Sequence, residues 1–260
     1  MRRITNPVTG GYPSGMSNVY SEPSNVDFTF GWYRTFLERL RSDGYRFRSF
    51  EEGADGDGVF LRHDVDLSIS AALDMARLEA NLDVTSTYLF LLTSPLYNPF
   101  EAEQRARIEE IADLGHDVGL HFSTHQYWPK EDPPEEGVLR DRVVAERSAM
   151  ETMLDVDVAE TTSFHIPPEW VLDREIAGLE SAYEPAFFSE MGYVADSGQR
   201  WRDDPPTVGS LPDRVQVLTH PGLWGDVDAE FERRIEAAAD DAVTRTRLQT
   251  HREFIDGAYS

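Results

Sequence analysis

The chain of 260 residues contains no cysteine, so it can hold neither a disulfide bond nor a metal site built on thiolates. Lys130 is its only lysine, and every other basic residue is arginine. Long apolar stretches are also missing. The longest uninterrupted one covers residues 88–92, whereas a membrane-spanning helix needs about 20 apolar residues. These absences argue against a disulfide-stabilised fold, a thiolate metal site and a transmembrane helix.

Acidic residues dominate the charge of the chain. Asp and Glu number 48 against 24 Lys and Arg, which gives a formal net charge of −24. So large a negative charge repels phosphate backbones and anionic lipids, and we therefore expect no nucleic-acid or membrane-surface partner. An acidic, lysine-poor surface is typical of salt-adapted (halophilic) proteins, because at about 1 M salt the Debye length is only about 3 Å and carboxylate repulsion is screened. A specialised acidic binding surface is the alternative.

The apolar content is sufficient for a substantial core. Hydrophobic residues make up 40% of the chain and aromatic residues 11%, which excludes a wholly disordered protein. Residues 1–25 are rich in Gly, Pro, Ser and Asn and predict an irregular N-terminal arm before a single domain over residues 26–260. The first residues include two arginines without the apolar segment of a secretory signal, so a cytoplasmic location is expected.

Strand and helix patterns alternate along the domain. Short apolar runs predict strands, and apolar residues at helical spacing predict helices. The expected strands cover residues 59–61, 86–92, 116–121, 162–166, 192–195 and 215–219, and the expected helices 27–41, 70–79, 101–114, 138–154 and 228–255. This alternation predicts an α/β fold with a parallel sheet or barrel and outer helices, in which ligands bind at the carboxyl ends of the strands.

Polar residues cluster at these strand ends. Six of them end a predicted strand or directly follow one: Asp64, Asp66, His121, His165, Asp196 and His220. Because the carboxyl ends of parallel strands meet at one edge of the sheet, we expect these side chains to converge on one site. The neighbouring His63 and His116 are interpreted as supports of the strand ends rather than as metal ligands.

Asp64 and Asp66 are two residues apart, so on an extended strand their side chains point to the same side. Two carboxylates this close are unfavourable in a site that excludes water, unless a cation lies beside them. The alternative is structural: an aspartate that caps the following helix, together with a solvated turn.

His121 and His125 are four residues apart. If the strand passes into a helical turn here, both imidazoles lie on one face and can reach one metal ion. Two imidazoles and a carboxylate would form a facial triad for one divalent ion, with zinc the first choice and cobalt, manganese, iron or nickel the alternatives. A pair at this spacing also arises by chance, so the pair alone is a weak signal.

His220 ends the V-Q-V-L-T-H strand. Histidine titrates near neutral pH, so this residue is a candidate general acid that protonates a leaving amine; the alternative is a strand-end histidine bound to backbone. His165 and Asp196 are less specific. We interpret them, with Trp201 and Trp224, as substrate-binding or supporting residues.

Five segments in this order resemble the polysaccharide deacetylases (carbohydrate esterase family four): L-R-H-D-V-D, G-H-D-V-G-L-H-F-S-T-H, S-F-H-I-P-P, V-A-D-S-G-Q-R-W and V-L-T-H-P. The resemblance covers residues 59–224. It implies a distorted, incomplete (β/α) barrel and the metal-dependent removal of N-acetyl groups from amino sugars. Carried over by motif, Asp64 is the general base, Asp66 the metal-bound carboxylate, His121 and His125 the metal-binding imidazoles, and His220 the general acid.

Two features depart from the family pattern. The first motif usually has two adjacent aspartates, whereas here Val65 separates them, as in an R-H-D-V-D subgroup of relatives. The third motif usually supplies an arginine near the base, whereas here it reads S-F-H-I-P-P. Arg62, Arg200 and Arg202 are the candidates to take that arginine's place.

The sequence therefore predicts a metal-dependent hydrolase of an N-acyl, expected N-acetyl, amino sugar or glycan precursor. A catalytically silent carbohydrate-binding relative is the main alternative. A non-haem iron oxygenase with the same three ligands is a third interpretation, which the βα alternation opposes. The sugar and the oligomeric state are left open.

Overall fold

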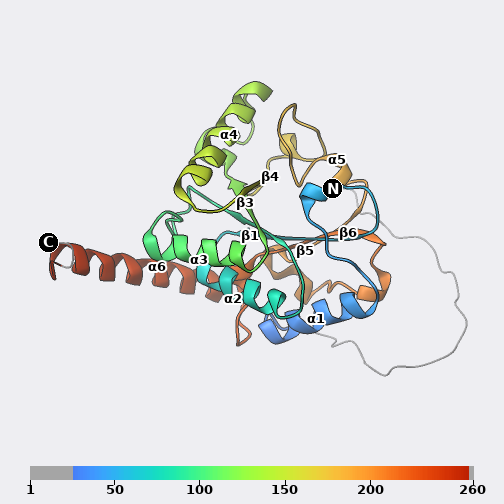
Figure 1. Ribbon diagram of the computed structural model, residues 1–260, viewed down its shortest axis with the longest axis horizontal. Helices are drawn as coiled ribbons and strands as arrows, with labels where there is room; N and C mark the ends of the chain where they lie inside the picture. The colour runs from blue at the N-terminus through green and yellow to red at the C-terminus, as the bar shows by residue number, and fades with distance from the viewer. Residues whose placement is uncertain (1–25, 258–260) are drawn as a thin grey trace, which may run out of the picture.

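The computed structural model describes residues 26–257 and is built on one six-stranded parallel sheet (Figure 1). The strands follow the order β4-β3-β2-β1-β6-β5. Their bounds are β1 Gly58–Val65, β2 Thr87–Phe90, β3 Asp117–Phe122, β4 Val158–Phe164, β5 Gly192–Ala195 and β6 Arg214–Thr219. The edge strands β4 and β5 do not pair with each other, so the sheet stays open. The predicted incomplete (β/α) barrel is confirmed, whereas the predicted arm lies outside the described residues.

Among the described residues, five of the six helices lie where the apolar spacing predicts them, within a few residues at each end, and the short α5 was not predicted. Their bounds are α1 Phe30–Ser42, α2 Ile69–Ala80, α3 Ala102–Asp113, α4 Glu136–Met153, α5 Pro185–Phe188 and α6 Phe231–Phe254. Helix α2 contacts both α1 and α3, and α4 packs on β3 and β4. The N-terminus of α2 is capped by Ser68, whose Oγ accepts from the backbone N–H of Ala71 at 3.2 Å. The cap is therefore not Asp66, and the structural alternative for that aspartate does not apply.

The open side of the barrel is filled by the segment around α5. Gln216 of β6 donates from Nε2 to the carbonyl oxygens of Ala182 and Phe187, at 3.0 and 2.7 Å. The ring of Phe188 packs edge-on against Tyr193 of β5 at 5.0 Å between centroids. These contacts place an irregular, largely apolar segment where further strands would close a complete barrel.

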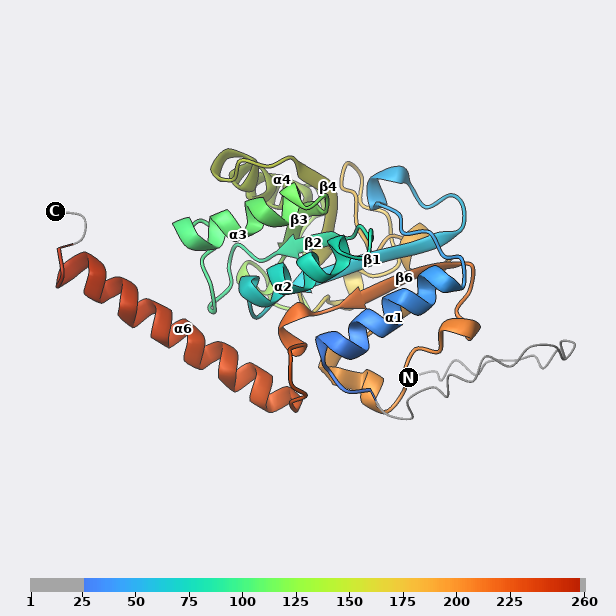
Figure 2. The ribbon, with the colours of Figure 1, turned by 60° about the horizontal axis from the view of Figure 1, so that its bottom comes forward.

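Helix α6 projects from the body of the molecule (Figure 2). None of its 24 residues is buried. One hydrogen bond from its middle reaches the body, donated by Nη2 of Arg245 to the carbonyl oxygen of Leu96 at 2.5 Å. Among residues 26–257, no helix combines the length and apolar character needed to cross a bilayer.

Candidate metal centre and active site

A cavity of about 710 Å³ lies at the carboxyl ends of the strands. Five of the six polar residues expected to meet there line it: Asp64, Asp66, His121, His165 and His220. The sixth, Asp196, is completely buried and lies against His220. The structure thus brings together all six strand-end residues.

Asp64 lies on β1 and is held by Arg62, two positions earlier on the same side of the strand. Nε of Arg62 donates to Oδ1 of Asp64 at 2.9 Å, and Nη2 donates to Oδ2 at 2.6 Å. The guanidinium is fixed in turn, because its Nη1 donates to Oε1 of Gln216 at 2.8 Å and its plane lies over the Tyr183 ring. Both partners of this bidentate pair are buried, which makes its geometry specific.

Of the three candidate arginines, Arg62 is therefore the one that pairs with Asp64. Arg202, another candidate, pairs instead with Asp228 at 2.7 Å. Burial by itself raises the pKa of the Asp64 carboxyl, but the Arg62 guanidinium outweighs burial, and the pKa falls to about 2. Asp64 is consequently ionised throughout the neutral range.

A chain of hydrogen bonds joins Asp64 to His121 through Ser163. The register of β3 and β4 places Ser163 directly beside His121, and its Oγ donates to Oδ1 of Asp64 at 2.9 Å. Since that hydroxyl proton points to the carboxylate, Oγ accepts from Nδ1–H of His121 at 2.5 Å. In the neutral imidazole the lone pair then lies on Nε2, which is 3.1 Å from Oδ1 of Asp66. Ser163 thereby orients both the candidate base and a candidate ligand.

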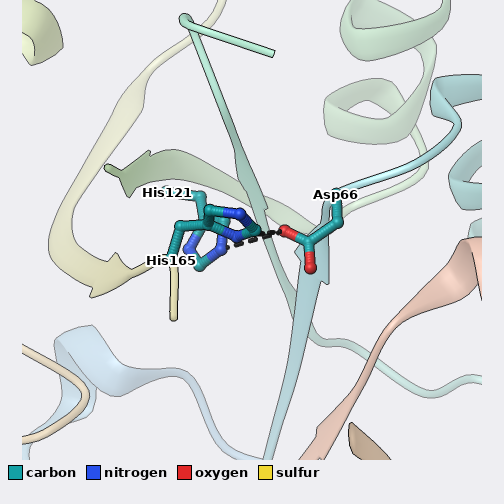
Figure 3. A group of neighbouring side chains, drawn as sticks. All are labelled: Asp66, His121 and His165. Carbon is teal, nitrogen blue, oxygen red and sulfur yellow. Dashed lines mark ion pairs between the residues drawn. The ribbon is translucent and has the colours of Figure 1, made fainter. Parts of the chain in front are cut away.

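Asp66, His121 and His165 form a compact group of possible metal ligands (Figure 3). One ligand atom from each residue lies within 4.8 Å of the others. Nδ1 of His165 is 3.0 Å from Oδ1 of Asp66, the same oxygen that faces His121. Burial raises the pKa of the Asp66 carboxyl, but the close approach of His121 and His165 and the charges of His121 and His220 prevail and hold it well below its usual range.

This group fits a divalent cation. Oδ1 of Asp66 is buried and has no hydrogen-bond partner of normal geometry among the described residues, although two imidazole nitrogens face it. A carboxylate oxygen and the lone pair of a neutral imidazole repel each other unless a proton or a cation lies between them. One carboxylate and two imidazoles form a ligand set typical of zinc and other first-row divalent ions.

His125 does not join this group. Strand β3 continues to Phe122, and the chain then enters a 3₁₀ turn at Thr124–Gln126. His121 thus keeps strand geometry, and the two histidines do not share a helical face as the i, i+4 spacing required. Nε2 of His125 instead donates to the carbonyl oxygen of Ile166 at 2.9 Å, and the side chain is exposed. His165, interpreted from the sequence as a substrate-binding or supporting residue, lies in this group instead.

His220 lies on the other side of Asp66, with Nε2 at 3.9 Å from Oδ2. Its Nδ1 donates to Oδ1 of Asp196 at 2.6 Å, and its backbone N–H donates to Oδ2 at 3.0 Å. Burial lowers the pKa of His220, but the Asp196 carboxylate outweighs burial and raises it to about 9. His220 is therefore protonated at neutral pH, as a proton donor must be.

The two predicted tryptophans lie behind the site. Nε1 of Trp224 donates to Oδ2 of Asp196 at 2.8 Å, so this residue helps to orient the partner of His220. Trp201 packs against Trp224 and Phe36 in the core. Neither indole lines the cavity, which gives both residues a supporting position.

His63 of β1 and His116, which directly precedes β3, meet the buried carboxylate of Glu79 in α2. Nε2 of His63 lies 2.9 Å from Oε1 of Glu79, and Nδ1 of His116 lies 3.7 Å from Oε2. The hydroxyls of Tyr33 and Tyr88 also donate to this carboxylate. Both histidines thus support the strand ends, as the sequence predicted.

Ser163 and Tyr183 were missed by the sequence interpretation. Ser163 precedes His165 by two positions, so the period-two rule that pairs Asp64 with Asp66 also points to it. Tyr183 accepts from Nη2 of Arg62 at 2.6 Å, but it lies in the irregular segment before α5, where no periodic pattern marks it.

No family model and no curated protein matches the chain. Among solved structures, a family 4 carbohydrate esterase pseudoenzyme from Bacillus anthracis aligns with 15% identity and a TM-score of 0.41, over 75% of this chain and 62% of that one. The chain thus spans less than two thirds of the length of that protein. A family 4 acetyl xylan esterase from Clostridium thermocellum, in complex with a cobalt ion, aligns with 14% identity and a TM-score of 0.41, over 74% and 83%.

A peptidoglycan deacetylase from Bacillus subtilis aligns with 12% identity and a TM-score of 0.42, over 80% of this chain and 99% of that one. At these identities and TM-scores, the similarities do not assign an activity. The family named for the first two structures, carbohydrate esterase family 4, is the polysaccharide deacetylase family that the sequence motifs resemble.

Proposed function

We propose that the protein is a metal-dependent hydrolase that removes an N-acyl group from an amino sugar. The observation that carries this proposal is the grouping of Asp66, His121 and His165 in the cavity, between an ionised carboxylate and a protonated histidine. A base, an acid and a cation site within one cavity are the components that amide hydrolysis requires.

Asp66, His121 and His165 would hold one divalent ion, with zinc preferred for a site of two imidazoles and one carboxylate. When bound, such an ion supplies a Lewis acid that activates water and polarises a carbonyl oxygen. The chain orients His121 through Ser163, whose Oγ lies 2.5 Å from Nδ1. A hydrogen bond at the ring nitrogen that does not face the metal site fixes the orientation of the imidazole and its tautomer.

Asp64 is the proposed general base. It is ionised, and its Oδ1 already accepts from Arg62 and Ser163, whereas Oδ2 accepts a single hydrogen bond from Arg62. Because a carboxylate oxygen accepts two hydrogen bonds, Oδ2 keeps one position for a proton taken from water. Arg62 keeps the carboxylate fixed while its charge changes.

His220 is the proposed general acid. Asp196 holds the Nδ1 proton at 2.6 Å, so the second imidazolium proton lies on Nε2 and faces the cavity. Transfer of that proton to the leaving nitrogen completes cleavage of the C–N bond. The proton that Asp64 takes from water and the proton that His220 gives to nitrogen balance the reaction.

The salt-adapted character is part of the proposal. The formal charge of −24 and the single lysine support it, and assays are therefore set in molar KCl. The cytoplasmic location stays a prediction.

The direct test is the release of acetate from N-acetylglucosamine and its short oligomers by zinc-loaded protein. We expect turnover in the parent and a loss of about 10²–10⁴-fold in Asp64→Asn, which is nearly isosteric but cannot accept the proton in the same way. Asp203→Asn, an exposed aspartate, is the matched control. Binding of these sugars without hydrolysis under any metal would instead identify the silent carbohydrate-binding relative.

A further inference from the structure

The cavity above the candidate metal centre is unusually apolar for a sugar site. Side chains from four separate parts of the chain line it: Leu91 after β2, Leu172 after β4, Phe188 in α5, and Phe231 and Ile235 in α6. Its volume of about 710 Å³ lies in the range of sites that enclose drug-sized ligands. An N-acetyl sugar presents one methyl group and many hydroxyls, and hydroxyls buried against apolar walls lose hydrogen bonds to water. The lining therefore matches a larger apolar group.

The side chain of Ile166 lines this cavity, and the backbone of this residue is strained. Its φ is +44°, a conformation that β-branched residues rarely adopt and that costs about 1–3 kcal/mol. The side chain lines the cavity and is 64% exposed. Nε2 of His125 donates to the carbonyl oxygen of Ile166 at 2.9 Å and so helps to hold this turn. The segment after β4 thus holds an apolar side chain at the cavity. Packing of the core does not require an apolar residue at this position.

Helix α6 contributes a second exposed apolar surface to the cavity. Phe231 and Ile235 are four residues apart, so they lie on one face of the helix. They are 40% and 37% exposed, and both line the cavity. In a chain with a formal charge of −24, large apolar side chains exposed beside a reactive site indicate a surface that a ligand covers.

His165 and His220 indicate which part of the substrate lies on each side of the cavity. His165 faces Oδ1 of Asp66 and His220 faces Oδ2, so the histidines flank the carboxylate. If His220 protonates the leaving nitrogen, the amine lies on its side of the cavity, together with Ser197, which follows Asp196, and with α6, which packs against the turn at residues 221–223. The acyl carbon then lies on the side of His165.

We infer that the substrate carries an N-acyl chain of several carbons, seated along the apolar segment after β4, which provides Ile166 and Leu172. This inference rests on the proposed hydrolase function. The reaction is the same amide hydrolysis: water adds to the acyl carbon, the C–N bond breaks, and a fatty acid carboxylate and a free amine are released.

The test is a series of N-acetyl-, N-butanoyl-, N-hexanoyl- and N-octanoyl-glucosamine with the zinc-loaded protein in molar KCl, with the amine product measured. Each methylene that becomes buried should raise kcat/KM about fourfold, which corresponds to about 0.8 kcal/mol. The double variant Ile166→Ser, Leu172→Ser should lose this gain at the longest chains. Val243→Ser in α6, 50% exposed and outside the cavity lining, is the control and should keep it.

Three outcomes separate this inference from the proposed function. Hydrolysis with a flat or falling series overturns the acyl-chain inference and leaves the hydrolase intact. A gain for octyl N-acetylglucosaminide in place of N-octanoyl-glucosamine also overturns it, because the apolar group then lies on the amine side. If nothing is hydrolysed, the proposed function fails, and calorimetry on the metal-free protein decides the inference. Binding of N-octanoyl-glucosamine more tightly than N-acetylglucosamine, lost in the double variant, supports it, and equal binding overturns it.

Discussion

Replacing Asp196 by Asn changes one atom behind His220 and should disable the general acid. Oδ2 of Asp196 accepts two hydrogen bonds, from the backbone N–H of His220 at 3.0 Å and from Nε1 of Trp224 at 2.8 Å. Both groups only donate, so they hold the oxygen of the new amide at this position. The amide NH₂ then faces Nδ1 of His220, which must become an acceptor. The single proton of the neutral ring then lies on Nε2, whereas the neutral ring of the parent would keep its proton on Nδ1, toward Asp196.

The expected change in the pKa of His220 follows from the burial of the imidazole and the charges around it. Burial lowers the pKa of His220 and the Asp196 carboxylate raises it, with a net result of about 9 against an ordinary value of 6.5. Without the Asp196 carboxylate, only the smaller effects of Asp66 and Asp64 oppose burial, and the pKa should return to about its ordinary value of 6.5 or lower. A fall of this size removes at least about 3 kcal/mol of preference for the imidazolium. The ring is then neutral at pH 7 and a far weaker proton donor, so kcat should fall by about 10²–10⁴-fold.

Two measurements check this reasoning. Histidine NMR titration of the metal-free parent should show His220 losing its proton near pH 9, and in Asp196→Asn the midpoint should fall by two pH units or more. The deacetylation rate of the zinc-loaded protein gives the kinetic effect. Trp224→Phe removes the indole hydrogen bond but keeps the carboxylate, so it should retain most of the shift. An unchanged midpoint in Asp196→Asn, or an unchanged rate, would refute the assigned role of Asp196.

Three further predictions concern stability and the division of roles. Glu79 is completely buried, and although burial opposes ionisation, His63 lowers its pKa to about 2 from 4.5. The stability that ionised Glu79 contributes is complete above pH 4.5 and is lost as the pH falls toward 2. Between pH 7 and pH 3, the unfolding free energy measured in urea should therefore fall by about 2 kcal/mol more in the parent than in Glu79→Gln. Parallel pH profiles of the two proteins would contradict this. The melting temperature should fall when KCl is lowered from molar to millimolar concentration, because carboxylate repulsion becomes unscreened, and a flat dependence would disprove salt adaptation. Asp64→Asn should keep the metal and lose activity, whereas Asp66→Asn should lose metal affinity in titrations; the opposite pattern would mean that the two roles are exchanged.

The convergence of the site residues could be predicted from the sequence because it depends on topology. Asp64, His121 and His220 each end a strand, and in a parallel sheet the strand ends meet at one edge whatever the details of packing. The pairing of Arg62 with Asp64 was also accessible, since residues two apart on a strand share a side. What the sequence left open was the choice among three arginines.

The ligand set depends on details that periodicity does not encode. Whether His125 reaches Asp66 depends on where β3 ends and on the type of turn that follows, and a 3₁₀ turn after Phe122 directs it to Ile166 instead. His165 reaches Asp66 from the residue directly after β4, where its backbone N–H donates to the carbonyl oxygen of Phe122 on β3 at 2.9 Å. Such long-range placement results from packing of the irregular segments around α5, which carry no repeating pattern.

The central claim is that Asp66, His121 and His165 bind one divalent ion, and metal stoichiometry in two matched variants tests it most directly. The parent, His125→Ala and His165→Ala are purified in molar KCl, loaded with zinc, and analysed for bound metal by mass spectrometry. The account predicts one ion per chain in the parent and in His125→Ala, and loss of the ion in His165→Ala. Retention of zinc in His165→Ala together with its loss in His125→Ala would contradict it.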